Sequence, residues 1–164
     1  MKRIILQVAA LVMAVTIHEV AHGWTAWRCG DPTARMMGRI TANPIKHLDP
    51  VGSVILPLLL VLTRSPVLFG WARPVPVQIR NLRKLPRDSI LVSVSGVTAN
   101  FLGAFAAGLV LRGLLTQPEL LSGPFPGTAL YTLAGFLGYF AVINIFLGVL
   151  NLTPVPPLDG GRIV

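Results

Sequence analysis

Long apolar segments without proline limit the folds that are open to this 164-residue chain. Three of them, at residues 4–27, 90–115 and 129–150, contain 22 or more residues each, and a helix of about 20 apolar residues crosses a bilayer. Charged residues make up only 12% of the chain, whereas soluble domains carry about 25%. The sequence therefore predicts an all-α polytopic membrane protein, with residues 1–164 forming a single transmembrane core.

A fourth apolar segment, at residues 51–70, is too interrupted to predict a full crossing. It contains two prolines and Arg64, and its apolar run ends at Leu62, which is too short to span. If the segment enters the membrane and returns, the ten basic residues from Arg28 to Arg87 all lie on one side. Because basic loops remain in the cytoplasm, the pattern favours three spanning helices plus a re-entrant or partial segment, with the basic side in the cytoplasm.

The charge and the cysteine content exclude other classes of protein. The formal net charge is +8, but the basic residues lie in loops beside apolar segments and form no face interleaved with aromatic residues. We therefore predict no nucleic-acid partner. Cys29 is the only cysteine, which excludes an intrachain disulfide and a metal site built from cysteines.

The first apolar segment contains the run His18-Glu19-Val20-Ala21-His22. Two histidines four residues apart lie on one face of a helix and can bind one zinc ion, while the glutamate between them can act as a base toward water. Ionisable side chains are costly within a bilayer, which argues against the alternative that these residues only mediate contacts between helices. The run predicts a hydrolytic zinc centre with His18 and His22 as ligands and Glu19 as the catalytic residue.

A catalytic zinc ion needs a third protein ligand and one open position, and Asp159 is the predicted third ligand. His47 and Asp49, on a polar loop, are the alternatives, whereas Glu119 lies on the opposite side of the membrane. With three crossings, the first and last helices run parallel and their C-terminal ends share one depth. Four crossings would place Asp159 and the two histidines near opposite faces, so this ligand set requires the three-crossing topology.

The chain after the last apolar segment is rich in proline and glycine, and it reads Asn151-Leu152-Thr153-Pro154-Val155-Pro156-Pro157-Leu158-Asp159-Gly160-Gly161-Arg162. Proline cannot continue a helix, and irregular backbone is tolerated at membrane depth only inside protein or beside a water-filled cavity. We expect the helix to break here so that Asp159 turns toward the metal, with Gly160 and Gly161 permitting the turn. An ordinary exit loop is the alternative.

Small residues recur every four positions along the segment 90–115, at Gly96, Asn100, Ala104 and Gly108. This spacing predicts close packing between membrane helices. For Asn100 and Asn144 we expect hydrogen bonds between helices, and the alternative for Asn100 is contact with the substrate or an oxyanion. Asn151 is a further candidate donor to a developing oxyanion.

Three motifs resemble those of the site-2 protease family of intramembrane zinc metalloproteases: His18-Glu19-Val20-Ala21-His22-Gly23, the Gly-x-x-x-Asn of Gly96–Asn100, and Asn151 with Leu158-Asp159-Gly160. Residues 30–35 and 43–50 are also similar to compact prokaryotic members. Val97 stands where the family usually has proline. The chain stops five residues after Asp159, where relatives commonly continue with more hydrophobic sequence, so it resembles a truncated or minimal member.

The resemblance implies one zinc ion per chain, bound by His18, His22 and Asp159, with Glu19 catalytic. It implies an endopeptidase that cleaves the transmembrane helices of membrane-anchored substrates, in regulated intramembrane proteolysis. The expected partners are such a substrate and the lipid bilayer. The expected location is a prokaryotic inner membrane, with the site open to the cytoplasm. The main alternative is an inactive zinc-binding scaffold that holds substrates, and a metal transporter ranks last because the outer halves of the helices offer few polar residues.

A substrate helix must unwind locally before it can be cut, and an extended edge could hold the unwound strand by backbone pairing. Residues 35–42 and residues 151–157 are the two candidate edges. The expected fold accordingly includes a short β-ribbon on the cytosolic side.

Overall fold

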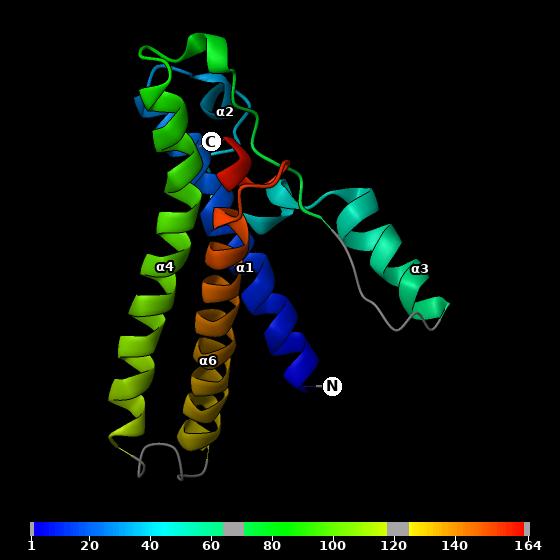
Figure 1. Cartoon of the computed structure of the whole chain (residues 1–164). Helices are drawn as coiled ribbons and strands as arrows, with labels where there is room; N and C mark the ends of the chain where they lie inside the picture. Colours follow the sequence, from blue (N-terminus) through cyan, green and yellow to red (C-terminus); the bar gives the residue numbers. More distant parts are fainter. Residues whose placement is uncertain (1, 64–70, 118–124, 163–164) are drawn as a thin grey trace.

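The computed structural model describes residues 2–63, 71–117 and 125–162. Three long helices, α1 (Lys2–Arg28), α4 (Arg87–Leu115) and α6 (Phe125–Leu152), pack against one another. Helices α1 and α6 run in the same direction and α4 runs opposite to them (Figure 1). All three are long and apolar enough to cross a membrane. This confirms the all-α polytopic membrane fold, and each predicted span lies within one of these helices.

Small side chains are common inside the helix bundle, and many large apolar side chains lie on its outside. Ala10 and Ala14 of α1 meet Ala107 of α4 and Phe140 of α6 in the buried core. Large apolar residues face outward instead, as at Phe105, which is 66% exposed. In a bilayer such residues meet lipid, so small residues serve the helix contacts and large ones serve the lipid contacts.

The predicted stripe of small residues lies where α4 meets its neighbours. Gly96, Asn100 and Ala104 are buried, whereas the fourth member, Gly108, is only partly buried, and a Cβ added there would meet no atom within 4 Å. The Asn100 side-chain amide donates a hydrogen bond to Asn144 Oδ1 (2.7 Å). The amide of Asn144 in turn donates to the Phe140 carbonyl (2.8 Å). The interhelical hydrogen bond expected of the two asparagines is therefore present.

The described residues at the start of the segment 51–70 lie beside the residues that follow the segment. A helical turn over Pro50–Ile55 leads into α3 (Leu56–Leu62), which projects to the side of the bundle (Figure 1). Three main-chain pairings join the two ends of the segment: Trp71 N donates to Gly52 O (3.2 Å), Arg73 N donates to His47 O (2.9 Å), and Leu48 forms an antiparallel bridge with Ala72. Residues 64–70 lie outside the described part, so the re-entrant or partial course of the segment stays a prediction, which these pairings favour.

The predicted β-ribbon is wrong for the described residues, where the bridge between Leu48 and Ala72 is the only strand-like pairing. Residues 35–42 do not form an extended edge, because Arg35 lies in the short helix α2 (Thr33–Met36). Gly38 then adopts φ +61° and ends that turn. The second candidate edge is also bent, since Thr153 N still donates to Leu150 O (3.1 Å) at the end of α6.

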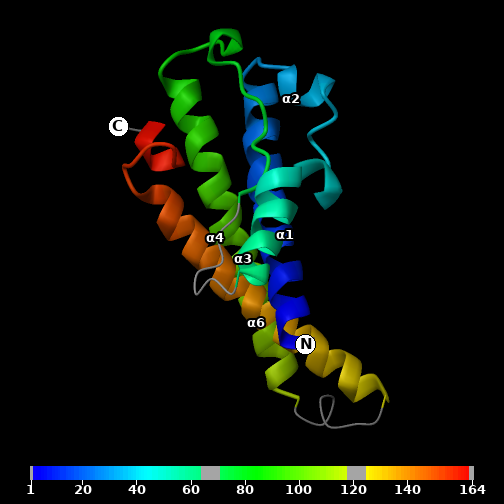
Figure 2. The same cartoon turned by 90° about the vertical axis from the view of Figure 1, so that its right-hand side faces the viewer.

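Residues 73–77, Arg73-Pro74-Val75-Pro76-Val77, form an irregular stretch that we call the proline strap. Figure 2 shows this green stretch running beside the C-terminal part of α1. After it come a helical turn over Ile79–Asn81 and then α4. Two further helical turns, Pro44–His47 and Asp159–Arg162, complete the described elements.

Candidate metal centre

The structure brings three predicted ligands together at one point between α1 and the turn that follows α6. His18 and His22 lie one turn apart on α1, and both are buried. His18 Nε2 lies 3.0 Å from Asp159 Oδ2, and His22 Nε2 lies 3.1 Å from the same oxygen. The two Nε2 atoms are 2.9 Å apart. The parallel course of α1 and α6 therefore produces the convergence that the three-crossing topology requires.

The chemistry of this cluster suits a zinc ion. Two imidazole nitrogens and one carboxylate oxygen form a ligand set found in catalytic zinc sites, which keep a fourth position open. The three atoms are only slightly closer together than the ligands of one tetrahedral zinc ion with bonds of about 2.0–2.1 Å. Within the described part of the chain, no other group of three such side chains converges in this way.

Helix α4 fixes the orientation of both imidazoles. His18 Nδ1 donates to Asn100 Oδ1 (2.5 Å), and His22 Nδ1 donates to the Val92 carbonyl (2.7 Å). A hydrogen on each Nδ1 leaves the Nε2 lone pairs directed at the metal position. The sequence indicated Asn100, but no sequence signal could identify Val92, because it contributes only a main-chain carbonyl.

Asp159 reaches the histidines because the chain folds back tightly after α6. A Cβ on Gly160 would lie 2.5 Å from the Leu152 carbonyl oxygen, and one on Gly161 would lie 2.7 Å from Pro156 N. The glycines thus permit close approach of the backbone, as predicted for this turn. Both imidazoles direct Nε2 at Asp159 Oδ2, so this carboxylate oxygen occupies the position of a third ligand.

Gly96 of α4 provides the space that the two imidazoles occupy. A Cβ at this position would lie 2.6 Å from His18 Cε1 and 2.7 Å from His22 Cε1. We expect Gly96→Ala to displace both rings and to lower zinc affinity by about 10- to 100-fold, the usual effect of disturbing the groups that orient metal ligands. Competition with a zinc chelator measures the affinity. The matched control is Gly108→Ala on the same helix, where a Cβ meets nothing; equal affinities in the two variants would contradict the assignment.

Glu19 is half-buried on α1, between the two histidines in sequence. Its Oε2 accepts a hydrogen bond from Val75 N of the proline strap (2.7 Å). The sequence predicted Glu19 but gave no indication of Val75, since the contact again uses main-chain atoms. The carboxylate is thus held by a segment 56 residues away in the chain.

The other residues considered as metal ligands have different contacts. His47 Nε2 donates to the Thr41 carbonyl (3.0 Å). Asp49 Oδ1 accepts from the main-chain N–H groups of the next helical turn, at 3.0 Å and 2.7 Å. Neither belongs to the cluster around Asp159. Glu119 lies outside the described residues.

The two asparagines considered for contact with an oxyanion differ in their surroundings. Asn100 is 0% exposed, and its amide is occupied by His18 on one side and Asn144 on the other. These contacts favour a role in orienting His18 over contact with substrate. Asn151 donates to the Leu147 carbonyl on its own helix (3.0 Å), and its oxyanion role stays a prediction.

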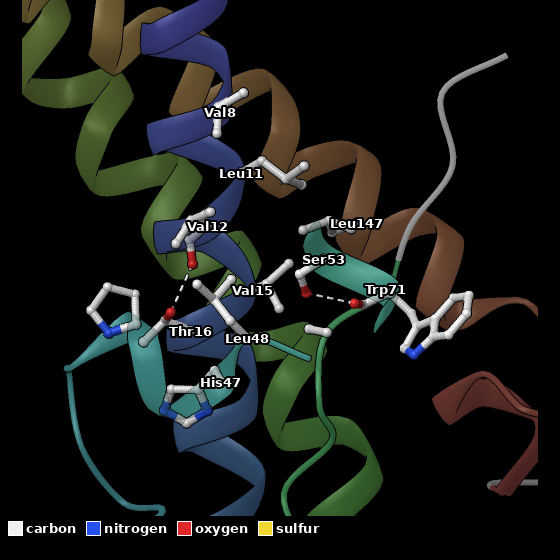
Figure 3. A pocket seen from close by; sticks show the side chains of 13 residues that line it. Val8, Leu11, Val12, Val15, Thr16, His47, Leu48, Ser53, Trp71 and Leu147 are labelled. Atoms are coloured by element: carbon white, nitrogen blue, oxygen red, sulfur yellow. Dashed lines mark hydrogen bonds between the residues drawn. The ribbon is translucent and has the colours of Figure 1, made fainter. Parts of the chain in front are cut away.

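An apolar cavity of about 510 Å³ lies beside α1 (Figure 3). Its lining includes Val8, Val12 and Thr16 of α1, together with residues 52–53 and 71–72. These three α1 residues recur at helical spacing, and Glu19 is the next position on the same side of the helix. The cavity therefore lies along the face of α1 that leads to Glu19.

Known proteins are similar in sequence to this chain over most of its length. A family model described as peptidase family M50 matches residues 111–164. The chain is 40% identical to "Putative zinc metalloprotease YwhC" of Bacillus subtilis, over 96% of this chain and 66% of that protein. It is 32% identical to "Putative zinc metalloprotease Rip2" of Mycolicibacterium smegmatis, over 95% of this chain and 54% of that protein. No solved structure shows a significant match.

The chain thus spans between about half and two thirds of the length of these relatives. Both relatives are named as putative zinc metalloproteases, and the cluster of His18, His22 and Asp159 is a ligand set that suits zinc. The family match and the two relatives show that the chain belongs to peptidase family M50, the site-2 protease family of zinc metalloproteases.

Proposed function

We propose that this protein is a zinc-dependent intramembrane endopeptidase that cleaves the transmembrane helices of membrane-anchored proteins. The observation that carries the proposal is the convergence of His18 Nε2, His22 Nε2 and Asp159 Oδ2 within 3.1 Å of one another. The two histidines belong to a helix long and apolar enough to span a membrane, and Asp159 follows another such helix. We propose one zinc ion per chain, with these three residues as its ligands.

The residues around the cluster divide the work of hydrolysis. When bound, zinc supplies a Lewis acid that polarises the scissile carbonyl and the attacking water. Glu19 takes a proton from that water and passes it to the leaving amine. Asn100 and the Val92 carbonyl hold the imidazoles in the orientation that ligation requires. Asn151 is the proposed donor to the developing oxyanion.

The apolar cavity beside α1 supports a substrate that is itself a membrane segment. Its lining is almost entirely apolar on the α1 side, from Val8 to Val15. A soluble peptide gains little from such a surface, whereas an apolar helix or its unwound end buries its side chains there. Because the cavity follows the face of α1 that leads to Glu19, a segment lying in it approaches the catalytic group.

The distribution of charge supports a site that opens to the cytoplasm. Nine basic residues lie in the described part between Arg28 and Arg87, in the connections next to the C-terminal end of α1. Lys2 and Arg3 begin α1 at the other end of the bundle. Basic connections are retained in the cytoplasm, so we propose a multi-pass protein of a prokaryotic cell membrane with its metal centre nearer the cytoplasmic face.

Metal removal in proteoliposomes tests the proposal. We expect the purified protein to cut a model transmembrane substrate, and 1,10-phenanthroline to reduce cutting to the level without enzyme. Zinc added after removal of the chelator should restore it, whereas magnesium should not, because two imidazoles and a carboxylate prefer zinc. A polar, water-soluble peptide is the substrate control. Cleavage that persists through chelation would exclude a metalloprotease.

A further inference from the structure

The proline strap presents one main-chain donor to the proposed base. Val75 N donates to Glu19 Oε2 at 2.7 Å. The residues on either side, Pro74 and Pro76, have no N–H group. Each proline fixes its own φ, and the residues before them, Arg73 and Val75, are confined to extended conformations. The strap is therefore stiff at the point where it meets Glu19.

Hydrogen bonds hold the strap at both ends. At its start, Arg73 N donates to the His47 carbonyl (2.9 Å). Just beyond its end, Gln78 N donates to Asp31 Oδ2 (2.6 Å). Asp31 is 0% exposed, and burial on its own would raise its pKa. Hydrogen bonds from Thr33, Asn81 and Gln78 instead lower that pKa, so Asp31 remains an anionic anchor for the strap.

The Val75 side chain packs directly onto α1. Val75 is 8% exposed and lies over Gly23, which is one helical turn beyond Glu19. A Cβ on Gly23 would be 2.9 Å from Val75 Cγ1 and 3.2 Å from the Ala34 Cβ. The absence of a side chain at Gly23 thus allows the strap to approach closely enough for its N–H to reach Glu19.

The Arg39 side chain also holds the strap through hydrogen bonds. It is 5% exposed, and its Nη2 donates to the carbonyls of Arg73 (2.7 Å) and Pro74 (3.4 Å). Burial lowers the pKa of Arg39, and Arg73 acts in the same direction, whereas the Glu19 carboxylate opposes them. Arg39 is thus a buried side chain that holds the backbone next to the Val75 N–H.

We infer that the proline strap and Arg39 are positioning elements for Glu19. The Val75 N–H holds Oε2, so that Oε1 faces the reacting water, and Arg39 keeps the Val75 N–H in place. The inference rests on the proposed function of Glu19 as the base. It assigns a catalytic consequence to Val75 and Arg39, which do not belong to the cluster of proposed zinc ligands.

The kinetics of Val75 and Arg39 variants distinguish the positioning of Glu19 from a role in packing alone. Val75→Pro removes the N–H that binds Glu19. Loss of a hydrogen bond to a charged group typically lowers a rate or an equilibrium constant by about 10- to 100-fold. We expect kcat to fall by that factor, with KM and zinc content unchanged. Val75→Ala keeps the N–H and should retain most of kcat. Arg39→Met should follow Val75→Pro, and Arg39→Lys should restore part of the loss.

Replacement of Val75 by its α-hydroxy acid keeps the side chain and removes only the N–H, so it decides the matter where Val75→Pro does not fold. A wild-type kcat in this ester variant would overturn the inference. Equal losses in Val75→Ala and Val75→Pro would also overturn it, because they would indicate packing alone.

Amide hydrogen exchange provides a readout that does not depend on cleavage. We expect the Val75 amide to be protected in the wild-type protein and to exchange about tenfold faster or more in Glu19→Ala. The Gln78 amide, bound to Asp31, is the matched control and should not change. Equal exchange at Val75 in the two proteins would overturn the inference, whereas failure of the proposed function would appear separately, as a wild-type protein that cuts no substrate.

Discussion

Glu19→Gln is expected to bind zinc as the wild type does and to cut a transmembrane substrate about 10²- to 10⁴-fold more slowly, the range for loss of a general base. Glutamine has nearly the same shape as glutamate but cannot accept the proton of the attacking water. The ligand atoms of His18, His22 and Asp159 remain in place. The measurement is zinc content and kcat on the same purified sample.

A charge-matched control accompanies this variant. Asp49→Asn also removes one negative charge, but Asp49 caps a helical turn outside the metal centre, so its kcat should stay close to that of the wild type. Undiminished turnover in Glu19→Gln would exclude Glu19 as the base. A wild-type protein that binds zinc yet cuts no substrate would instead favour the alternative of a zinc-binding scaffold.

Asp159→Ala is expected to abolish stable zinc binding. The substitution removes the one carboxylate oxygen that lies within 3.1 Å of both histidine Nε2 atoms. Loss of a direct ligand should exceed the 10- to 100-fold reduction in affinity that is typical when only an orienting partner is lost. Metal analysis after dialysis should therefore give a zinc content well below one per chain, and cleavage should fall with it.

The fold of Asp159→Ala can be checked by its helical circular dichroism, which should match the wild type because α1, α4 and α6 pack independently of this side chain. Asp159→Glu, which keeps a carboxylate, should recover part of the zinc. Full zinc occupancy in Asp159→Ala would contradict the proposed ligand set. The two alternatives, His47 and Asp49, would then need to leave the hydrogen bonds that now occupy them.

The features of this fold that could be predicted from sequence are those that depend on local patterns. Apolar length predicted the three spanning helices, and the interrupted segment at residues 51–70 contains only a short helix, α3, in its described part. The four-residue spacing of His18 and His22 predicted their shared face, and helix direction then brought Asp159 to them. Each of these inferences uses the periodicity or the length of a segment, which a sequence records directly.

The contacts that the sequence did not reveal depend on main-chain atoms or on burial. The Val92 carbonyl and the Val75 N–H orient His22 and Glu19, but any residue type can supply such groups. Arg39 was counted among the basic loop residues, although it is buried against the proline strap. Only the paired prolines around Val75 could have indicated a stiff segment there, without indicating what it contacts.

The predicted β-ribbon failed for a related reason. Residues 35–42 contain few strong signals for a turn, but α2 and the left-handed Gly38 redirect the chain before an edge can form. Asn100 shows the opposite case. Its position on the stripe of small residues was informative about packing, and its full burial explains why its amide serves His18 and Asn144.

X-ray absorption at the zinc edge of the purified protein tests the central claim most directly, because it reports the identity of the ligand atoms. The predicted spectrum shows nitrogen and oxygen ligands at about 2.0–2.1 Å, with the multiple-scattering signature of two imidazoles. A sulfur ligand at about 2.3 Å, which only Cys29 or a methionine could supply, or a spectrum with fewer than two imidazoles would contradict a zinc ion held by His18, His22 and Asp159.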